Sequence, residues 1–569
     1  MSNSADKKWL ARQVTIALMA GAVSIVPQVA QGMPQGGEAI AGGATGISVP
    51  SGATTMNITS NATNNIIGWE DFSIQRGETV NFDNKNYLNL VRGKGSSFID
   101  GTMTAGGGNI YLINPNGVIF GEGAKVDVGA GTFAASTQAI DTINQAAFVA
   151  NGKCDDLSAA GTTMDVVNLI DPTKGYIKAS HVEMDGRNIR FMNTASIQTA
   201  GATVNLNSNT DAPVVNAGNG YVHIGYEAAV NDAYNDPAVK TMDAKAAELT
   251  TAGWKVNGQA IDKSNTYMLI HNAAQLQNMQ TKTDGNYMLG RDITLTGSFT
   301  PVSTFSGNFD GNFYTIYDLD VRVSSGNAGL FANVTGGTGR SRIENVLFGK
   351  KASGTNIFVG RDTDYAGVVA GQANNALFQN IGIKDGGQVE DDASDEWMSG
   401  GIVGSADDVT IRSSYNAHTC RGGGIVGTVT NKTKIYDVYN TGKVRYGIIG
   451  GKRKGATIER VYSTQADVND KMWEDWAGYA TTDGLNWDQV GENLKGYFYF
   501  SDTSPTNKEI GIKSDNARYG TFINGIALQK MSNTKITPWG SEHISADGGA
   551  RTTWRIHSDV GGKSLPTLT

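Results

Sequence analysis

The chain has 569 residues, of which 73 are glycine, 11 are proline and 18% are charged, and its formal net charge is −8. A nucleic-acid-binding protein needs a basic stripe, so this charge balance excludes a nucleic-acid partner. A disordered chain would be rich in proline, glutamate and lysine, whereas abundant glycine and asparagine indicate short strands joined by tight turns.

The N-terminus has the pattern of a secretory signal peptide. Three basic residues precede the apolar run VTIALMAGAVSIV (14–26), which is too short to span a bilayer, and small residues follow at Ala30 and Gly32. We predict a signal peptide over residues 1–32 that is cleaved after Ala30 or Gly32; the alternative is a buried first helix. No later apolar run reaches the roughly 20 residues that a membrane-spanning helix needs, so we expect an exported, soluble protein.

The cysteines do not suggest a metal site. Cys154 and Cys420 lie 266 positions apart, and neither has a His or second Cys at ligand spacing. We therefore expect no metal site, no cofactor and a fold that does not depend on disulfides. One long-range bridge between the two cysteines remains an alternative.

Residues 33–230 show the pattern of short strands. Segments such as ETVNF, GNIYLI, GVIFG and AKVDVG alternate apolar and polar residues or form brief apolar runs, and Gly, Asn and Asp separate them. No segment here has the periodicity of a helix. We predict a solenoid of parallel strands in which each coil stacks about 4.8 Å above the last.

Residues 231–285 interrupt this pattern. Four apolar residues of AVKTMDAKAAEL fall on one helical face: Val239, Met242, Ala246 and Leu249. In NAAQLQNM, Asn272 and Gln275 have the spacing of a capping box. We predict a connecting excursion with short helices between two strand-rich regions.

Residues 286–465 contain an internal repeat. The stretches AGLFANVTG…RIENVLFG, AGVVAGQANNALFQNIGI, GGIVGSADDVTIRSSYN, GGIVGTVTNKTKIYDVYN and YGIIGGKRKGATIERVYS align, and each has a glycine followed by two apolar residues. The marker glycines, at spacings of 38, 34, 23 and 23 residues, are Gly329, Gly367, Gly401, Gly424 and Gly447. We predict a repeat β-solenoid in which these glycines let the backbone turn sharply and equivalent side chains stack as ladders.

Residues 466–569 are rich in Trp and Tyr, as in MWEDWAGY and GYFYFSD. The end of a solenoid exposes a sheet edge, so we predict that this region covers it. Extracellular repeat proteins are often longer, and we also expect the chain to be a fragment or a truncated product.

Three motifs occur together in the first strand-rich region. They are Trp-x-x-Phe-x-Ile (Trp69, Phe72, Ile74), Gly-Glu-x-Val-x-Phe (Gly77, Glu78, Val80, Phe82) and Asn-Pro-Asn-Gly (Asn114, Pro115, Asn116, Gly117). With these motifs, residues 33–140 closely resemble the filamentous haemagglutinin-like secretion domain of two-partner secretion exoproteins, and weaker similarity extends to about residue 225. A second Asn-Pro-Asn-Leu motif of the family is missing, because NYLNL (86–90) lacks the proline.

This resemblance implies a right-handed parallel β-helix with an N-terminal cap. It also implies export through the general secretory translocon, followed by recognition of this region by a dedicated outer-membrane β-barrel transporter. The repeats in 329–463 resemble the Gly-Leu-x-Gly (GLUG) repeats of bacterial surface proteins, which implies a surface-exposed stalk or binding solenoid.

The Asn-Pro-Asn-Gly stretch is a well-formed β-turn. Pro115 presets φ at the second position, Gly117 suits the fourth, and Asn114 can hydrogen-bond forward. Two interpretations are open: a corner that stabilises the fold, and a signal that the transporter recognises in the extended chain. Folding of the solenoid outside the cell would help to draw the chain outward, which links the two.

The sequence contains no recognisable catalytic motif. Its histidines are scattered, with no His-Glu-x-x-His or Ser-His-Asp pattern, so we expect no enzyme. The acidic run EDDASDEW (390–397) predicts a solvated loop, with a weak calcium site as the alternative.

The sequence thus predicts an all-β, secreted adhesin at the bacterial cell surface that binds a glycan or protein on host or neighbouring cells. Two alternatives are open. The chain could be the N-terminal part of a cytolysin or contact-dependent growth inhibition toxin with a downstream effector. It could also be a carbohydrate-active β-helix, which would need a carboxylate pair on adjacent coils facing one groove.

Overall fold

The structure is a computed structural model. It describes residues 32–463 apart from residues 44, 156, 159–161, 163, 210–219, 228–240, 338, 352–356, 362–363, 385–386, 391–397, 431, 441, 445–448 and 451–456, and beyond them the strands β39–β43. The described residues divide into two compact units, an N-terminal unit up to Leu269 and a C-terminal unit from Ile270.

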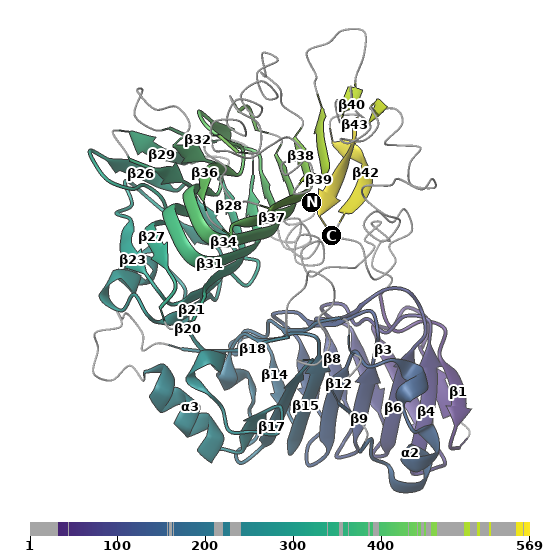
Figure 1. The fold of residues 1–569 in the computed structure, drawn as a ribbon. Coiled ribbons are helices and arrows are strands. Elements are labelled where there is room, and N and C mark those ends of the chain that lie inside the picture. Colours follow the sequence, from purple (N-terminus) through teal and green to yellow (C-terminus); the bar gives the residue numbers. More distant parts are fainter. Residues whose placement is uncertain are drawn as a thin grey trace. The chain divides into compact units, whose positions relative to one another are not determined.

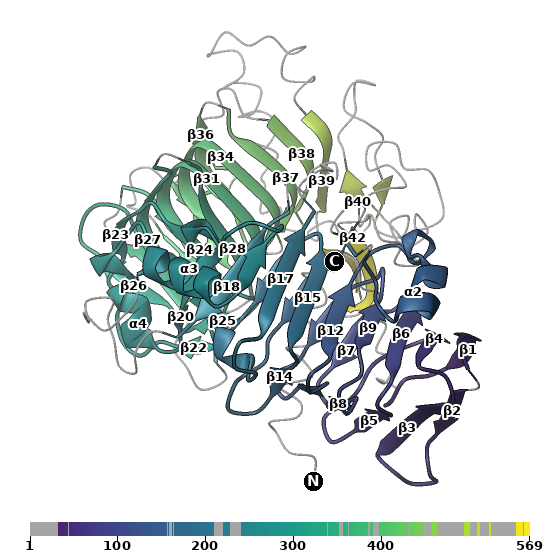
Figure 2. The same ribbon diagram turned by 90° about the horizontal axis from the view of Figure 1, so that it is seen from below.

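The N-terminal unit is a solenoid with three long sheets (Figures 1 and 2). The first sheet contains β1 (Glu38–Ala41), β4 (Asn64–Trp69), β6 (Asn86–Val91), β9 (Ile110–Ile113), β12 (Thr132–Ser136), β15 (His181–Gly186), β17 (Thr203–Ser208) and β19 (Trp254–Val256). The second contains β2 (Thr45–Ser48), β3 (Thr55–Ser60), β5 (Thr79–Phe82), β8 (Thr102–Thr104), β11 (Lys125–Asp127) and β14 (Tyr176–Lys178). The third contains β7 (Ser97–Ile99), β10 (Val118–Phe120), β13 (Val166–Asn168), β16 (Ile189–Phe191), β18 (Val222–Tyr226) and β20 (Thr266–Ile270).

Consecutive strands of one coil enter different sheets, and each strand pairs with its counterpart in the next coil. Val118, for example, pairs in parallel with Ser97 of the preceding coil and with Val166 of the following one. Among the described strands of the N-terminal unit, only β1 and β2 pair antiparallel, with β4 and β3 respectively, and these two strands cover the first edge of the stack. The predicted all-β fold with parallel sheets is confirmed.

The motif residues of the sequence lie in the interior of this solenoid. Trp69, Phe72, Ile74, Val80 and Phe82 are all buried in one continuous hydrophobic cluster. The Trp69 and Phe72 rings meet edge to face at 5.3 Å, and the Trp69 indole N–H donates to Asn89 Oδ1 at 2.9 Å. The first motif therefore supplies an aromatic anchor together with a partner for its one polar atom.

A second apolar cluster lies on the outer face of the first sheet. Ile66, Leu88, Tyr111 and Ile113 are buried there, and α2 (Gln145–Asn151), preceded by η1 (Ile140–Thr142), packs against this cluster through Phe148 (Figure 1). The expectation that no helix occurs in 33–230 is thus wrong for α2, η1 and η2 (Thr194–Ser196). The helix forms because the outward strand positions here are apolar and require a cover.

The segment after residue 230 belongs to both units. The predicted helix is α3 (Met242–Thr251), and its buried residues are Met242, Ala246 and Leu249, whereas Val239 lies outside the described residues. The strand β19 after it pairs with β17, and η3 (Lys263–Asn265) leads into β20, so this part continues the first solenoid. The N-terminal compact unit thus extends to Leu269.

The second predicted helix is α4 (Ala273–Asn278), which η4 (Met279–Thr281) follows. Asn272 caps it by accepting from the Gln275 backbone N–H at 2.9 Å. In a capping box the Gln275 side chain would accept from the Asn272 backbone N–H. Here it accepts from the backbone N–H of the preceding residue, His271, at 2.7 Å.

The C-terminal unit is also built from stacked parallel strands. Its main sheet contains β21 (Asn286–Leu289), β22 (Ile293–Thr294), β23 (Val302–Phe305), β24 (Asn308–Asp310), β25 (Thr315–Tyr317), β27 (Phe331–Thr335), β28 (Ser341–Gly349), β31 (Ala370–Ile383), β34 (Val403–Asn416), β36 (Val426–Thr430), β37 (Lys434–Asn440) and β38 (Thr457–Ser463). Two further sheets contain β26 (Asp320–Val323), β29 (Ile357–Arg361), β32 (Gly387–Val389) and β35 (Thr419–Cys420), and β30 (Ala366–Gly367) and β33 (Ser399–Gly400).

Strand pairing reproduces the repeat alignment of the sequence. Ile343, Phe378, Ile411, Ile435 and Ile458 occupy equivalent positions of the five repeats and are paired one after another from β28 to β38. The first four are buried, so the predicted ladder of apolar side chains exists.

The marker glycines lie at bends of the backbone and are closely packed. Gly329, Gly401 and Gly424 are in bends, a bend directly follows Gly367, and none of these four has a positive φ. An added Cβ would come within 2.6 Å of Gly367 O at Gly329 and within 2.1 Å of Gly424 O at Gly401. Gly367 and Gly424 are equally crowded, and Gly447 lies outside the described residues. The left-handed corner positions are instead filled by residues such as Asn345 (φ 56°) and Asn380 (φ 54°), a conformation that asparagine tolerates.

Beyond residue 463 the described elements are β39 (Leu494–Phe500), β40 (Glu509–Gly511), β41 (Ile523–Asn524), and the hairpin β42 (Trp554–Val560) and β43 (Lys563–Leu568). The β39 strand continues the parallel stack on β38, and β40 pairs with it antiparallel. Across the part of the chain that is described, no helix is long and apolar enough to cross a membrane. The buried thiols of Cys154 and Cys420 form no disulfide, so the proposed long-range bridge is absent.

Candidate functional site

The Asn-Pro-Asn-Gly turn forms the corner between β9 and β10. Gly117 N–H donates to Asn114 O at 3.0 Å, which closes the turn, and Gly117 has φ 110°, a conformation that favours glycine. Asn114 Oδ1 accepts from Asn116 N–H at 2.9 Å, so the predicted forward hydrogen bond is present. The local geometry predicted from the four residues is therefore confirmed.

The two asparagine side chains bind this corner to the preceding coil. Asn114 is fully buried, and its Nδ2 donates to Gly95 O and to Ser97 Oγ, each at 3.0 Å. Asn116 Nδ2 donates to Gly93 O at 2.8 Å. Because the amide hydrogens are used inside the fold, the folded corner exposes only parts of Pro115 and Asn116.

Glu78 of the second motif holds the N-terminal segment. Its Oε2 accepts from Gln75 N–H at 2.7 Å and from Met33 N–H at 2.8 Å. Ala30 lies outside the described residues, whereas Gly32 is described and lies against the Glu78 carboxylate. Cleavage after Gly32 would turn the Met33 amide into an ammonium group beside that carboxylate, which would convert a hydrogen bond into an ion pair.

The C-terminal unit carries two rows of polar side chains on one side of its main sheet. The first row is Asn333, Gln372, Ser405 and Thr428, and the second is Asn374, Asp407 and Thr430. All are exposed or half-buried, and the members of each row are register partners on neighbouring strands. We call these seven residues the repeat polar face. Sequence reasoning missed it, although the alternation of polar and apolar residues in QANN and SADD was its signal.

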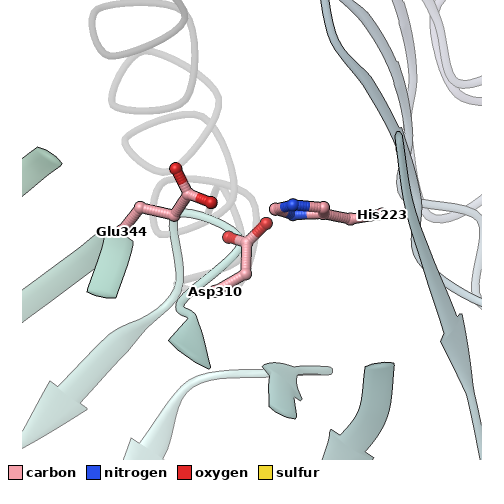
Figure 3. Close-up of side chains that lie close together, drawn as sticks. All are labelled: His223, Asp310 and Glu344. Atoms are coloured by element: carbon pink, nitrogen blue, oxygen red, sulfur yellow. The ribbon is translucent and has the colours of Figure 1, made fainter. Parts of the chain in front are cut away.

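Adjacent coils of the C-terminal unit also bear a carboxylate pair. Asp310 on β24 and Glu344 on β28 are register partners, both buried, and Figure 3 shows both carboxylates. Arg342 Nη2 donates to Glu344 Oε2 at 3.0 Å, and Asn345 Nδ2 donates to Asp310 Oδ1 at 3.0 Å. Within their unit these bonds give both carboxylates a structural role.

His223, the third residue labelled in Figure 3, belongs to the N-terminal unit. There its ring stacks on Tyr221 with centroids 4.1 Å apart, and its Nε2 lies 3.0 Å from Tyr267 Oη. Of the acidic run predicted to form a loop, residues 391–397 lie outside the described residues.

These features define a class: a capped parallel β-helix with a tightly bonded Asn-Pro-Asn-Gly corner, followed by a stacked repeat solenoid. Residues 30–288 match the TPS secretion domain family. The match supports a two-partner secretion exoprotein, which is a class of secreted protein.

Similar proteins come from Haemophilus influenzae. A heme/hemopexin-binding protein of strain ATCC 51907 / DSM 11121 / KW20 / Rd is 35% identical over 120 residues, which are 20% of this chain and 13% of the relative. A second heme/hemopexin-binding protein is 34% identical over 97 residues, 16% of this chain and 10% of the relative. The chain thus matches only about an eighth or less of these relatives' length.

Among solved structures, the HMW1 secretion domain from Haemophilus influenzae aligns with 76% of this chain and 95% of its own, at 15% identity and a TM-score of 0.23. An alignment with this TM-score adds nothing to the fold that strand pairing already defines.

Proposed function

We propose that this protein is a secreted adhesin that acts by binding and not by catalysis. Residues 1–32 serve as a signal peptide for the general secretory translocon, the N-terminal unit is exported by the outer-membrane transporter, and the GLUG-type repeats present the binding surface. The observation that carries the binding part is the repeat polar face.

The chemistry of this face suits a hydroxyl-rich ligand such as a cell-surface glycan or glycoprotein. It offers amides, hydroxyls and one carboxylate, which together can donate and accept hydrogen bonds. Asn374 Nδ2 already donates to Asp407 Oδ2 at 3.2 Å, which holds two neighbouring coils in a fixed arrangement. Repetition along the stack, at about 4.8 Å per coil, presents equivalent groups in a straight row.

The two asparagines of the corner motif act on secretion through folding. Their polar atoms are bonded to the preceding coil, so the folded corner offers a partner little to recognise. Completion of this corner outside the cell would stabilise the coils already exported and would oppose their return.

The binding proposal is tested with full-length protein on a glycan array and on intact host and bacterial cells. Replacing the exposed Gln372 and Asn374 together with alanine is expected to weaken binding about thirtyfold, since each of the two lost hydrogen bonds contributes roughly 1 kcal/mol. Gln388→Ala, an exposed residue on β32 of another sheet, is the matched control and should bind as the wild type does. A wild type that binds no surface, or a double variant with unchanged binding, would refute the proposal.

Among the described residues, a carbohydrate-active alternative would rest on the carboxylate pair Asp310 and Glu344 of adjacent coils, but both side chains are buried. The heme/hemopexin-binding function named for the relatives is that of those proteins, and the short matches do not extend it to this chain. Release of reducing ends from a bound glycan, lost in Asp310→Asn, would replace the adhesin proposal with a catalytic one.

A further inference from the structure

Two acidic side chains lie on the outer face of the first sheet of the N-terminal unit. Glu183 and Asp185 on β15 point outward, because Val182 and Met184 between them belong to the interior core. Asp185 is the register partner of Ser136 on β12 and of Asn207 on β17. Three successive coils therefore bring oxygen-bearing side chains to one place.

Asn207 bridges the two carboxylates. Its Nδ2 lies 2.8 Å from Asp185 Oδ1 and 3.2 Å from Glu183 Oε1. Asp185 is fully buried, and its other oxygen, Oδ2, has no hydrogen-bond partner among the described residues. Glu183 is also largely buried, with its side chain 17% exposed.

The single amide group of Asn207 cannot neutralise the negative charge of two carboxylates. A buried carboxylate is costly in its ionised form unless positive charge or several donors lie beside it. His181 Nε2 lies 3.8 Å from Glu183 Oε2, and His181 Nδ1 lies 2.7 Å from Thr203 Oγ1. Burial, together with the Glu183 charge, raises the pKa of Asp185 to about 8. The cluster therefore requires a proton or a bound cation.

We propose that Glu183, Asp185 and Asn207 form a calcium site. The two carboxylates offer four oxygens, and the Asn207 amide turned by 180° would present its oxygen to the same point. An all-oxygen ligand set suits Ca²⁺, whereas Mg²⁺ prefers to keep several waters and Zn²⁺ prefers nitrogen or sulfur. The ion would neutralise the pair and join the coil of β15 to that of β17.

The site joins residues that no local motif connects. Asn207 lies 22 positions after Asp185, which is one full coil, and only the register places them side by side. The expectation of no metal rested on the absence of a local ligand pattern and did not consider this arrangement. The inference is independent of the adhesin proposal, because it concerns the stability of the exported unit.

The test compares thermal unfolding of the full-length protein in roughly millimolar Ca²⁺ and in EGTA at pH 7.4. The wild type is expected to melt at a higher temperature with Ca²⁺, and Asp185→Asn is expected to lose that difference. Asp127→Asn, on β11 of the second sheet, is the control and should keep the wild-type response, because the Asp127 carboxylate pairs with Lys178 and not with a residue of this cluster. Glu183→Gln, at a less buried position, serves as the second variant if Asp185→Asn does not fold.

Terbium luminescence gives a second measurement. Tb³⁺ added to the wild type should emit when tyrosine and tryptophan are excited, and Ca²⁺ should displace it, whereas Asp185→Asn should lose this emission. Equal melting temperatures in Ca²⁺ and EGTA would overturn the proposal. A melting temperature that rises as the pH falls from 8 to 4, without any effect of Ca²⁺, would also overturn the proposal. A proton shared by the two carboxylates would then stabilise the cluster in place of the ion.

Discussion

Replacing Asn114 with alanine is expected to lower the free energy of unfolding of the N-terminal unit by about 3 kcal/mol. The substitution removes the donors to Gly95 O and Ser97 Oγ and the acceptor for Asn116 N–H, all at a fully buried position. The groups left behind lose their partners where water does not reach, which costs more than the loss of an exposed hydrogen bond. Urea unfolding followed by circular dichroism measures the change.

Asn114→Ala is also expected to reduce the amount of protein released into the medium. A control variant shows whether this reduction results from lost stability or from lost recognition by the transporter. Leu206→Ala removes a fully buried side chain from the core of the same unit, at a cost of about 2–5 kcal/mol, without touching the corner. If Asn114→Ala and Leu206→Ala lower release equally for an equal loss of stability, the motif acts through folding. If release collapses in Asn114→Ala while its unfolding curve is unchanged, the transporter recognises the motif directly, and our interpretation of the corner is wrong.

Replacing Phe148 with alanine is expected to cost about 3–5 kcal/mol. Phe148 is fully buried and its ring meets that of Tyr111 edge to face at 5.6 Å. It is the only buried residue of the seven in α2, so without it the helix loses its anchor, and Ile66, Leu88 and Ile113 become exposed to water. Urea unfolding measures the loss, and increased binding of a hydrophobic dye should report the exposed cluster.

Val149→Ala is the matched control for this prediction. Val149 is the next residue of the same helix and is 37% exposed, so its truncation should change stability by less than about 0.5 kcal/mol. Equal effects of the two substitutions would mean that α2 is not held through Phe148, and that the outer apolar cluster does not depend on its cover.

The interior of both units could be predicted from the sequence because it depends on local alternation. Strands such as Val118–Phe120 and the stacked Ile343, Phe378 and Ile411 follow from apolar residues at fixed intervals. The corner at Asn114–Gly117 was predictable for the same reason, since its hydrogen bonds to itself involve only four consecutive residues.

Features that depend on the register between coils could not be predicted. The outer face needs the cover that α2 provides only because Ile66, Leu88 and Ile113 come together there from three coils. The sequence did contain signals for the ends of this helix, with Asn144 as N-cap and Gly152 after its last turn. The close packing of the marker glycines could not be predicted for the same reason, because the nearest atom to an added Cβ at Gly401, the Gly424 carbonyl oxygen, belongs to the next coil.

Two-partner export of the whole chain is the central claim, and one measurement tests it most directly. The intact protein is expressed with its outer-membrane transporter and without it, and the amount of chain released into the medium is compared at equal expression. We expect release only when the transporter is present, because we propose that it recognises the secretion domain that residues 30–288 match. Equal release in both cases would contradict the account.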